Sequence, residues 1–201
     1  MRHPKMMCFA FFFVLACSSH PSSQVAATGY SNTRPSVGAP LSSYDPEMPL
    51  HTRGRFIVDA NERRVKLASV NWYGASDTYM VPGGLNRAPL THIVAQIKAL
   101  GFNSVRLPFS NFMLSASRVD DQAIAANPQL FGLTPIAVYD RVVEALTDAG
   151  ILVILNNHTT HPMWCCSYDH DGLWYTSDYS EERWLDDWGF MARRYLANSR
   201  V

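Results

Sequence analysis

GILVILNNH, residues 150–158, sets five apolar residues between a glycine and three polar ones. An unbroken, β-branched apolar run of this length is typical of a strand that is buried on both faces, as in a parallel sheet. Helical patterns lie on either side of it, over residues 134–150 and from Ser180 onward. The run therefore predicts an α/β fold built from alternating strands and helices.

The helix before this run has clear boundary signals. Thr134 is expected to cap it, Pro135 to open it and Gly150 to close it. Its apolar residues recur at helical spacing, which predicts one buried side. That side is expected to carry Tyr139, Val142, Val143, Leu146 and Ala149.

A similar unit lies one step earlier in the chain. Pro89 occupies a favoured first-turn position and Gly101 a favoured stop, which predicts a helix between them. A short strand over residues 103–108 follows, and Pro108 is expected to end it. The buried face of the helix is expected to carry Leu90, Ile93, Val94, Ile97 and Leu100.

The two ends of this region add a hairpin and a third helix. Residues 55–58 and 65–67 flank a turn at 59–61, which predicts a β-hairpin, and residues 67–70 continue as a buried strand. A helix is expected to start near Ser180. Its first turn carries Glu181 and Glu182, and one face carries Trp184, Trp188, Met191 and Tyr195.

Strand and helix thus alternate three times, an order used by doubly wound sheets and by closed eight-stranded barrels. The absence of a Gly-rich phosphate loop after the first strand argues against a dinucleotide fold. The leading hairpin and the long aromatic loops favour the barrel. Because such a barrel typically needs about 250 residues, we expect a partial (β/α)8 TIM barrel of about three N-terminal βα units over residues 51–201.

The first 50 residues are excluded from this barrel. A basic start and a short apolar run from Met6 to Ala16 predict a signal peptide over residues 1–18. Residues 19–50, rich in Ser and Pro, are predicted to form a disordered tether. We therefore expect a secreted, extracellular protein, and the alternative is a lipid anchor through Cys17.

Charge and cysteine content narrow the possible partners. Lys plus Arg and Asp plus Glu number 17 each, so the formal net charge is zero and no field favours nucleic acid or an anionic membrane. The apolar run is too short to span a bilayer, and a monomer is expected at full length.

Cys165 and Cys166 are adjacent, and a bond between neighbours is strained, so their pairing stays open.

In a barrel the site lies where the strands end at their C-terminal side. Polar and aromatic residues at those ends are Asn71, Trp72, Arg106, Asn157 and His158. The loop over residues 161–175 adds Trp164 and Trp174, whose rings can stack on the C–H face of a sugar while polar groups bind its hydroxyls. These seven residues are the predicted substrate-binding set, and a polysaccharide or oligosaccharide is the expected partner.

A metal-dependent hydrolase is a weaker alternative. His158, His161, Asp169 and His170 cluster in sequence, but they match no zinc signature, and His161 precedes a proline in a segment that follows a strand. We therefore expect no metal site and no cofactor.

The run from Arg55 to Tyr195 resembles the N-terminal part of glycoside hydrolase family 5, the cellulase family. The resemblance is carried by RFIVD (55–59), VKL (65–67), VNWYG (70–74), LGFNSVRLPF (100–109), GILVILNNH (150–158) and DGLWY (171–175). It implies a (β/α)8 barrel and a retaining mechanism on β-linked glycans. It also implies that Arg106 orients the nucleophile and that His158 matches the family's histidine after strand three. Many members carry an aspartate in place of Asn156.

The resemblance also locates the catalytic acids elsewhere. The family's acid/base glutamate lies in an Asn-Glu pair after strand four and its nucleophile after strand seven, so both are expected beyond Val201. A retaining hydrolase needs two carboxyl groups about 5–5.5 Å apart. The acidic residues of the third helix, Glu181, Glu182, Asp186 and Asp187, are expected to cap it or face solvent.

No catalytic residue is therefore assigned within these 201 residues. We expect a cellulase- or β-glucanase-like enzyme that is truncated before its glutamates and inactive as this chain. The alternative is a non-catalytic, carbohydrate-binding relic of such an enzyme.

Overall fold

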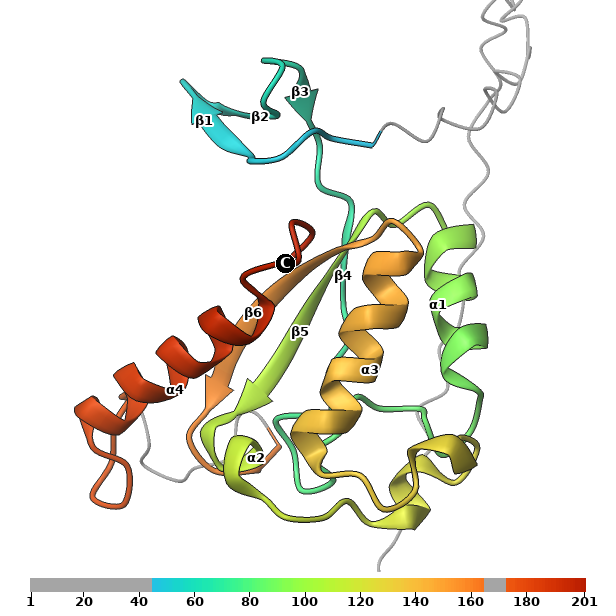
Figure 1. Cartoon of the computed structure of the whole chain (residues 1–201), viewed down its shortest axis with the longest axis vertical. Helices are drawn as coiled ribbons and strands as arrows, with labels where there is room; N and C mark the ends of the chain where they lie inside the picture. Colours follow the sequence, from blue (N-terminus) through green and yellow to red (C-terminus); the bar gives the residue numbers. More distant parts are fainter. Residues whose placement is uncertain (1–44, 165–172) are drawn as a thin grey trace, which may run out of the picture. The chain divides into compact units, whose positions relative to one another are not determined.

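A computed structural model of the chain describes residues 45–164 and 173–201 (Figure 1). The expected signal peptide, the possible anchor at Cys17 and most of the expected tether lie outside the described residues, as do Cys165, Cys166 and the 169–171 part of the aromatic loop. Within the described residues, no helix is both long enough and apolar enough to cross a membrane.

The described chain begins with a small antiparallel sheet. Strands β1 (His51–Arg53), β2 (Phe56–Val58) and β3 (Arg64–Val65) pair in the order β1-β2-β3. This confirms the predicted hairpin and adds β1 to it. The turn is held by the buried carboxylate of Asp59, which accepts from the backbone N–H groups of Asn61 (3.0 Å) and Arg63 (2.9 Å). The Glu47 carbonyl also accepts from Ala60 N, so residues just before β1 contact the hairpin.

A second, parallel sheet carries the strand-helix alternation. Strands β4 (Ser69–Asn71), β5 (Ser104–Ser110) and β6 (Leu152–Thr159) lie in the order β4-β5-β6. The helices between and after them are α1 (Leu90–Ala99), α2 (Asn111–Ser115), α3 (Pro135–Asp148) and α4 (Glu181–Tyr195), with 3-10 turns at Asp121–Ile124 and Pro128–Leu130. In Figure 1, α1 and α3 lie side by side. The predicted order of strands and helices is confirmed, and in the described residues the sheet is open rather than closed into a barrel.

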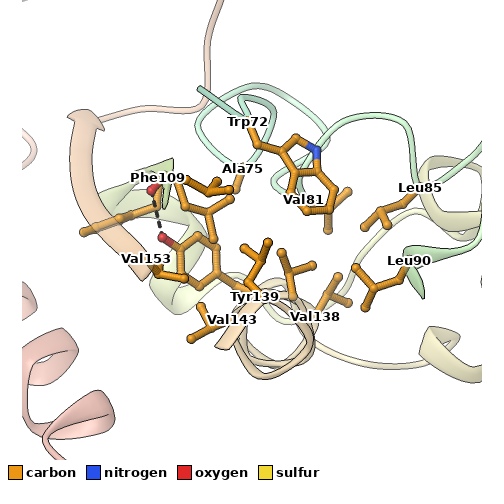
Figure 2. Packing of buried hydrophobic residues seen from close by; sticks show 14 of the residues in the cluster. Trp72, Ala75, Val81, Leu85, Leu90, Phe109, Val138, Tyr139, Val143 and Val153 are labelled. Carbon is orange, nitrogen blue, oxygen red and sulfur yellow. Dashed lines mark hydrogen bonds between the residues drawn. The ribbon is translucent and has the colours of Figure 1, made fainter. Parts of the chain in front are cut away.

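The apolar core lies between this sheet and helices α1 and α3. Tyr139 of α3 is fully buried and donates its hydroxyl to the Leu107 carbonyl of β5 at 2.8 Å. Its ring packs edge-on against Phe109 at 6.2 Å between ring centroids (Figure 2). As predicted, Val142, Val143 and Leu146 share this buried side of α3. The core therefore locks β5, the central strand, against α3.

The predicted start of α3 is confirmed in detail. The Thr134 hydroxyl accepts from Ala137 N at 3.3 Å, and Pro135 occupies the first turn. After the helix, Gly150 adopts a φ of +79°, which a glycine adopts without a steric penalty. Local residues therefore determine both ends of this helix.

Two apolar residues expected inside the core are exposed. Leu100 follows the last residue of α1 and is 72% exposed. The helical spacing placed Leu100 on the buried face, but the helix ends at Ala99, one residue before it. Ile154 of β6 is 40% exposed, so the expected burial holds for Ile151, Leu152 and Val153 and fails at Ile154, whereas Leu155 is partly buried against the core. Successive strand residues alternate between faces, and Val153 faces the helices whereas Ile154 lies on the opposite face.

Strands β4 and β5 also differ from expectation. β4 begins at Ser69 and is partly exposed, since it is the edge of the sheet in the described residues. Pro108 lies inside β5 instead of ending it. The Arg106 carbonyl accepts from Trp72 N at the last rung between β4 and β5. Pro108, two residues later in β5, has no N–H group to donate toward β4. Because β4 has already ended at this level, no hydrogen bond between the two strands is lost.

Candidate functional site at the ends of the parallel strands

Three predicted site residues meet at the C-terminal edge of the parallel sheet. The register pairs Asn71 of β4 with Arg106 of β5. Arg106 donates from Nη1 to Asn71 Oδ1 at 2.7 Å, and its Nη2 lies 3.3 Å from His158 Nδ1 of β6. One guanidinium thus joins side chains from all three strands. We call Asn71, Arg106 and His158 the Arg106 cluster.

Burial and the nearby charge of Arg106 both favour the neutral form of His158. Burial, and then the positive charge of Arg106, lower the pKa of His158 below its ordinary value. Guanidinium nitrogens only donate, so His158 Nδ1 must accept and the proton of the neutral ring resides on Nε2. His158 therefore presents a neutral N–H donor, which suits a sugar hydroxyl or a carboxylate oxygen.

His158 occupies an irregular position in its strand. The register runs from Phe109↔Asn157 to Ser110↔Thr159, so β6 contains one extra residue at His158. Such a bulge bends the strand and re-aims a side chain, and bulges are common next to active sites. The sequence carries no glycine or proline here that would reveal the bulge, and hence sequence reasoning missed it.

Two predicted site residues lie away from the Arg106 cluster. Trp72 is 8% exposed, belongs to the core and donates from Nε1 to the Gly83 carbonyl at 2.8 Å (Figure 2). Asn157 donates to Asn111 Oδ1 and accepts from Trp184 Nε1, both at 2.9 Å. Trp72 directly follows Asn71, and Asn157 directly precedes His158. Neighbouring residues of an extended chain point to opposite sides, so both side chains point away from the Arg106 cluster.

The two predicted loop tryptophans present ring surface. Trp164 is 58% exposed and packs edge-on against Tyr73, with 4.9 Å between ring centroids. The Met163 N–H donates to the Ser76 carbonyl at 3.0 Å, which ties the loop after β6 to the loop after β4. Trp174 is half-exposed and lies 6.3 Å from Trp184 of α4. Tyr73, which directly follows the predicted Asn71 and Trp72, is an additional rim aromatic.

The acidic residues of α4 divide into two groups. Glu181, Glu182 and Asp186 are exposed, as expected, and hydrogen bonds from its own backbone N–H and from Ser180 lower the pKa of Glu182. Asp187 instead is buried, at 7% exposure, and the expectation that it caps the helix or faces solvent is wrong. Its carboxylate accepts from Asn111 Nδ2 at 2.7 Å and pairs with Arg183, which explains how it tolerates burial.

In the described residues, the Arg106 cluster contains neither a metal-binding group nor an acidic partner for Arg106. Across residues 45–164 and 173–201, no group of three or more His, Cys, Asp or Glu side chains is placed to hold a metal ion. In the same residues Arg106 forms no ion pair, and its two side-chain partners are neutral. Asn156, on the same strand, has a buried Oδ1 without a hydrogen-bond partner in the described part. The edge thus offers a cation, amides and an imidazole.

Comparison with known proteins gives a consistent result. A family model described as cellulase, glycosyl hydrolase family 5, matches residues 58–201. A glycosyl hydrolase 5 family protein of Chamaecyparis obtusa is 40% identical over 176 residues, covering 78% of this chain and 31% of that protein. The major extracellular endoglucanase of Xanthomonas campestris pv. campestris is 34% identical over 142 residues, covering 70% of this chain and 28% of that protein. The chain thus spans about a third of the length of these relatives.

Solved structures show the same similarity. The catalytic domain of the Xanthomonas campestris endoglucanase superposes with a TM-score of 0.65 at 33% identity, covering 76% of this chain and 42% of that one. An endocellulase from Pyrococcus horikoshii in complex with cellotetraose superposes with a TM-score of 0.66 at 28% identity, covering 78% and 42%.

Proposed function

The chain belongs to the cellulase family, glycosyl hydrolase family 5, and we propose that it supplies part of the sugar-binding edge of a retaining, cellulase-like hydrolase of β-linked glucans. The Arg106 cluster carries this proposal. It gathers one cation, one amide and one neutral imidazole from three different strands. In a (β/α)8 barrel, the fold that the family implies, this edge holds the active site.

Arg106 is proposed to orient a carboxylate nucleophile. Its guanidinium hydrogen-bonds only to neutral side chains in the described residues, so its positive charge is not compensated by a local ion pair. A fixed guanidinium binds a carboxylate in a defined orientation through paired N–H donors. Arg106 is therefore suited to hold an acid in its charged, nucleophilic form, the role that the family resemblance implies.

Direct contacts with the glycan are proposed for a subset of the predicted residues. His158 and Asn71 can hydrogen-bond to hydroxyls, and the exposed rings of Trp164 and Trp174 can stack on sugar faces. Trp72 and Asn157 are assigned supporting roles, because their polar atoms bind protein groups. The Pyrococcus horikoshii endocellulase, solved with cellotetraose, supports a glucan as the ligand class.

Hydrolysis is proposed to require groups that this chain does not supply. A retaining glycosidase uses two carboxyl groups about 5–5.5 Å apart. No carboxylate of residues 45–164 or 173–201 hydrogen-bonds to Arg106 or His158. We therefore infer that the 201-residue chain alone does not cleave β-glucans.

A hydrolysis assay tests this inference. The purified 201-residue chain is incubated with carboxymethylcellulose and with cellotetraose, and released reducing ends are measured. We expect none above the level of a heat-treated sample. Sugar release that co-purifies with the chain and is lost in Arg106→Ala would show that the chain contains its own catalytic acids.

A second candidate function is binding of carbohydrate without cleavage. The exposed aromatic rings of Trp164 and Trp174 favour it, since they need no catalytic acid. An assay on the longest natural protein that contains residues 45–201 distinguishes the two functions. Cleavage of cellotetraose supports the enzyme, whereas saturable binding of the intact sugar with no products supports the binding protein.

Export to the cell surface or beyond is also proposed. The basic and apolar start of the sequence is typical of a signal peptide, and the Xanthomonas campestris relative is an extracellular endoglucanase. Mass spectrometry of the mature N-terminus distinguishes the two forms of export. A free N-terminus supports secretion, and a diacylglyceryl-modified Cys17 supports a lipid anchor.

A further inference from the structure

A chain of side-chain hydrogen bonds runs from α4 through α2 to the end of β6. Trp184 Nε1 donates to Asn157 Oδ1 at 2.9 Å, and Asn157 Nδ2 donates to Asn111 Oδ1 at 2.9 Å. Asn111 Nδ2 then donates to Asp187 Oδ2 at 2.7 Å, and Arg183 Nε donates to Asp187 Oδ1 at 3.2 Å. We call these five residues the Asp187 network.

The direction of every bond in the network is fixed by its two ends. The indole of Trp184 can only donate, and the ionised carboxylate of Asp187 can only accept. Both amides between them must therefore point their oxygens toward Trp184 and their nitrogens toward Asp187. Asn111 and Asp187 are buried, so the loss of one of their hydrogen bonds would leave a buried polar group unsatisfied, which is costly.

The network ends beside the bulge that carries His158. Asn157 pairs with Phe109 just before the bulge, and Ser110 pairs with Thr159 just after it. Asn111 directly follows Ser110, so the Asn157–Asn111 bond spans the irregular step from one strand to the other. The backbone bond from Phe112 N to the Thr160 carbonyl closes the same step at 3.1 Å. The bulge is thus held from its helix-facing side.

We propose that Asp187 is a positioning residue, which acts through Asn111 and Asn157 to hold His158 against Arg106. The network would then set the orientation of an imidazole at the sugar-binding edge from a helix that does not touch the sugar. This proposal rests on the proposed function only in calling that edge of the sheet a sugar-binding edge. The position of His158 itself can be tested without any sugar.

A plain structural brace is the alternative, and it predicts a different result. A brace between α4 and the sheet would lower the melting temperature when weakened but would leave the imidazole of His158 unchanged. A positioning network would also change the 3.3 Å contact with Arg106, to which the pKa of His158 is sensitive.

The test uses nuclear magnetic resonance of histidine ring nitrogens in the 201-residue chain, with His158→Gln to assign the signal. Trp184→Phe removes one donor and keeps an aromatic ring. We expect the pKa of His158 to rise toward the ordinary value of about 6.5 and its Nδ1 shift to lose the signature of a hydrogen-bond acceptor. The matched control is Trp188→Phe, one turn later on the same helix.

A second pair of variants tests the carboxylate. Asp187→Asn should change the His158 signal, whereas Asp140→Asn should not, although Asp140 also anchors α4 by accepting from Arg194 Nε at 2.6 Å. Identical His158 behaviour in Trp184→Phe and Trp188→Phe would overturn the proposal. Should Asp187→Asn fail to fold, the tryptophan pair still decides. A parent chain that binds no cellotetraose, while His158 responds to the variants as expected, would count against the proposed function and not against the network.

Discussion

Arg106 connects β5 to the ends of β4 and β6 through hydrogen bonds of ordinary length to neutral partners. The sequence predicted Asn71, Arg106 and His158 as strand-end residues, and this holds for Asn71 and His158. Arg106 is instead the third residue of the seven-residue β5, and its side chain reaches the other two. The sequence could not separate them from Trp72 and Asn157, which occupy the same run ends. The separation depends on which face each residue takes and on the bulge at His158, and both are set by pairing between strands.

At the residue scale, we predict that Arg106→Met raises the pKa of His158. Burial and the Arg106 charge both oppose protonation of this imidazole, and the variant removes the second cause. Titration of the ring by nuclear magnetic resonance measures the shift. Arg118→Met, which removes an exposed cation paired with Asp121, is the control and should leave His158 unchanged. A lower pKa in Arg106→Met would contradict the assignment.

The same shift has a consequence for stability. The folded-state pKa of His158 lies below its unfolded value, so folding disfavours protonation of the ring. The stabilising contribution is present above the unfolded pKa of about 6.5 and is lost as the pH falls through the lowered folded-state value. We predict that Arg106→Met loses less stability than the parent between pH 7 and pH 5, as measured by urea unfolding.

At the element scale, helices α3 and α1 begin in different ways. Thr134 and Pro135 start α3 from adjacent residues, and the sequence predicted both. The first N–H of α1, on Leu90, instead donates at 2.7 Å to Asn127 Oδ1, 37 positions later. Asn127 also donates to the carbonyls of Leu85 and Ala88. A side chain so distant in sequence leaves no local signal, and hence it was missed.

We predict that Asn127→Ala destabilises the fold by about 2 kcal/mol, because it leaves the buried Leu90 N–H without its acceptor and the part-buried Ala88 carbonyl without its donor, whereas the Leu85 carbonyl keeps the Ala126 N–H. The free energy of unfolding in urea measures the loss, and hydrogen exchange should locate it at the first turn of α1. Asn86→Ala, an exposed position in the same connection, is the matched control and should cost less than about 0.5 kcal/mol. Equal costs would show that Asn127 does not hold the helix.

The turn after β4 depends on Gly74. Its φ is +128°, and a Cβ at this position would collide with the Gly83 nitrogen and lie 2.6 Å from the Val81 carbonyl oxygen. We predict that Gly74→Ala costs roughly 3 kcal/mol or more, from backbone strain and overpacking together. Gly101→Ala is the control: its φ is also positive, at +84°, but no atom lies within 4 Å, so only about 1 kcal/mol of strain is expected. Thermal unfolding of both variants compares them.

At the scale of the whole molecule, the face of the sheet away from α1 and α3 has a mixed character. Ser69 and Ser104 share a hydrogen bond on it, Arg106 and Asn71 meet at its edge, and Ile154 is exposed. In a closed barrel this face lines the interior, where layers of side chains fill the space. The sequence predicted the alternation of elements but not the exposure of Ile154, because burial depends on strands outside the local pattern.

We propose that this chain forms a working sugar-binding edge of a family 5 hydrolase. The most direct measurement grafts residues 58–201 in place of the matching segment of the Xanthomonas campestris endoglucanase, which supplies the rest of the barrel. We predict that the folded chimera hydrolyses carboxymethylcellulose and that Arg106→Ala lowers kcat/KM at least about 100-fold, whereas Arg118→Ala leaves it unchanged. A folded, active chimera whose kcat/KM is the same with and without Arg106 would show that this edge takes no part in hydrolysis.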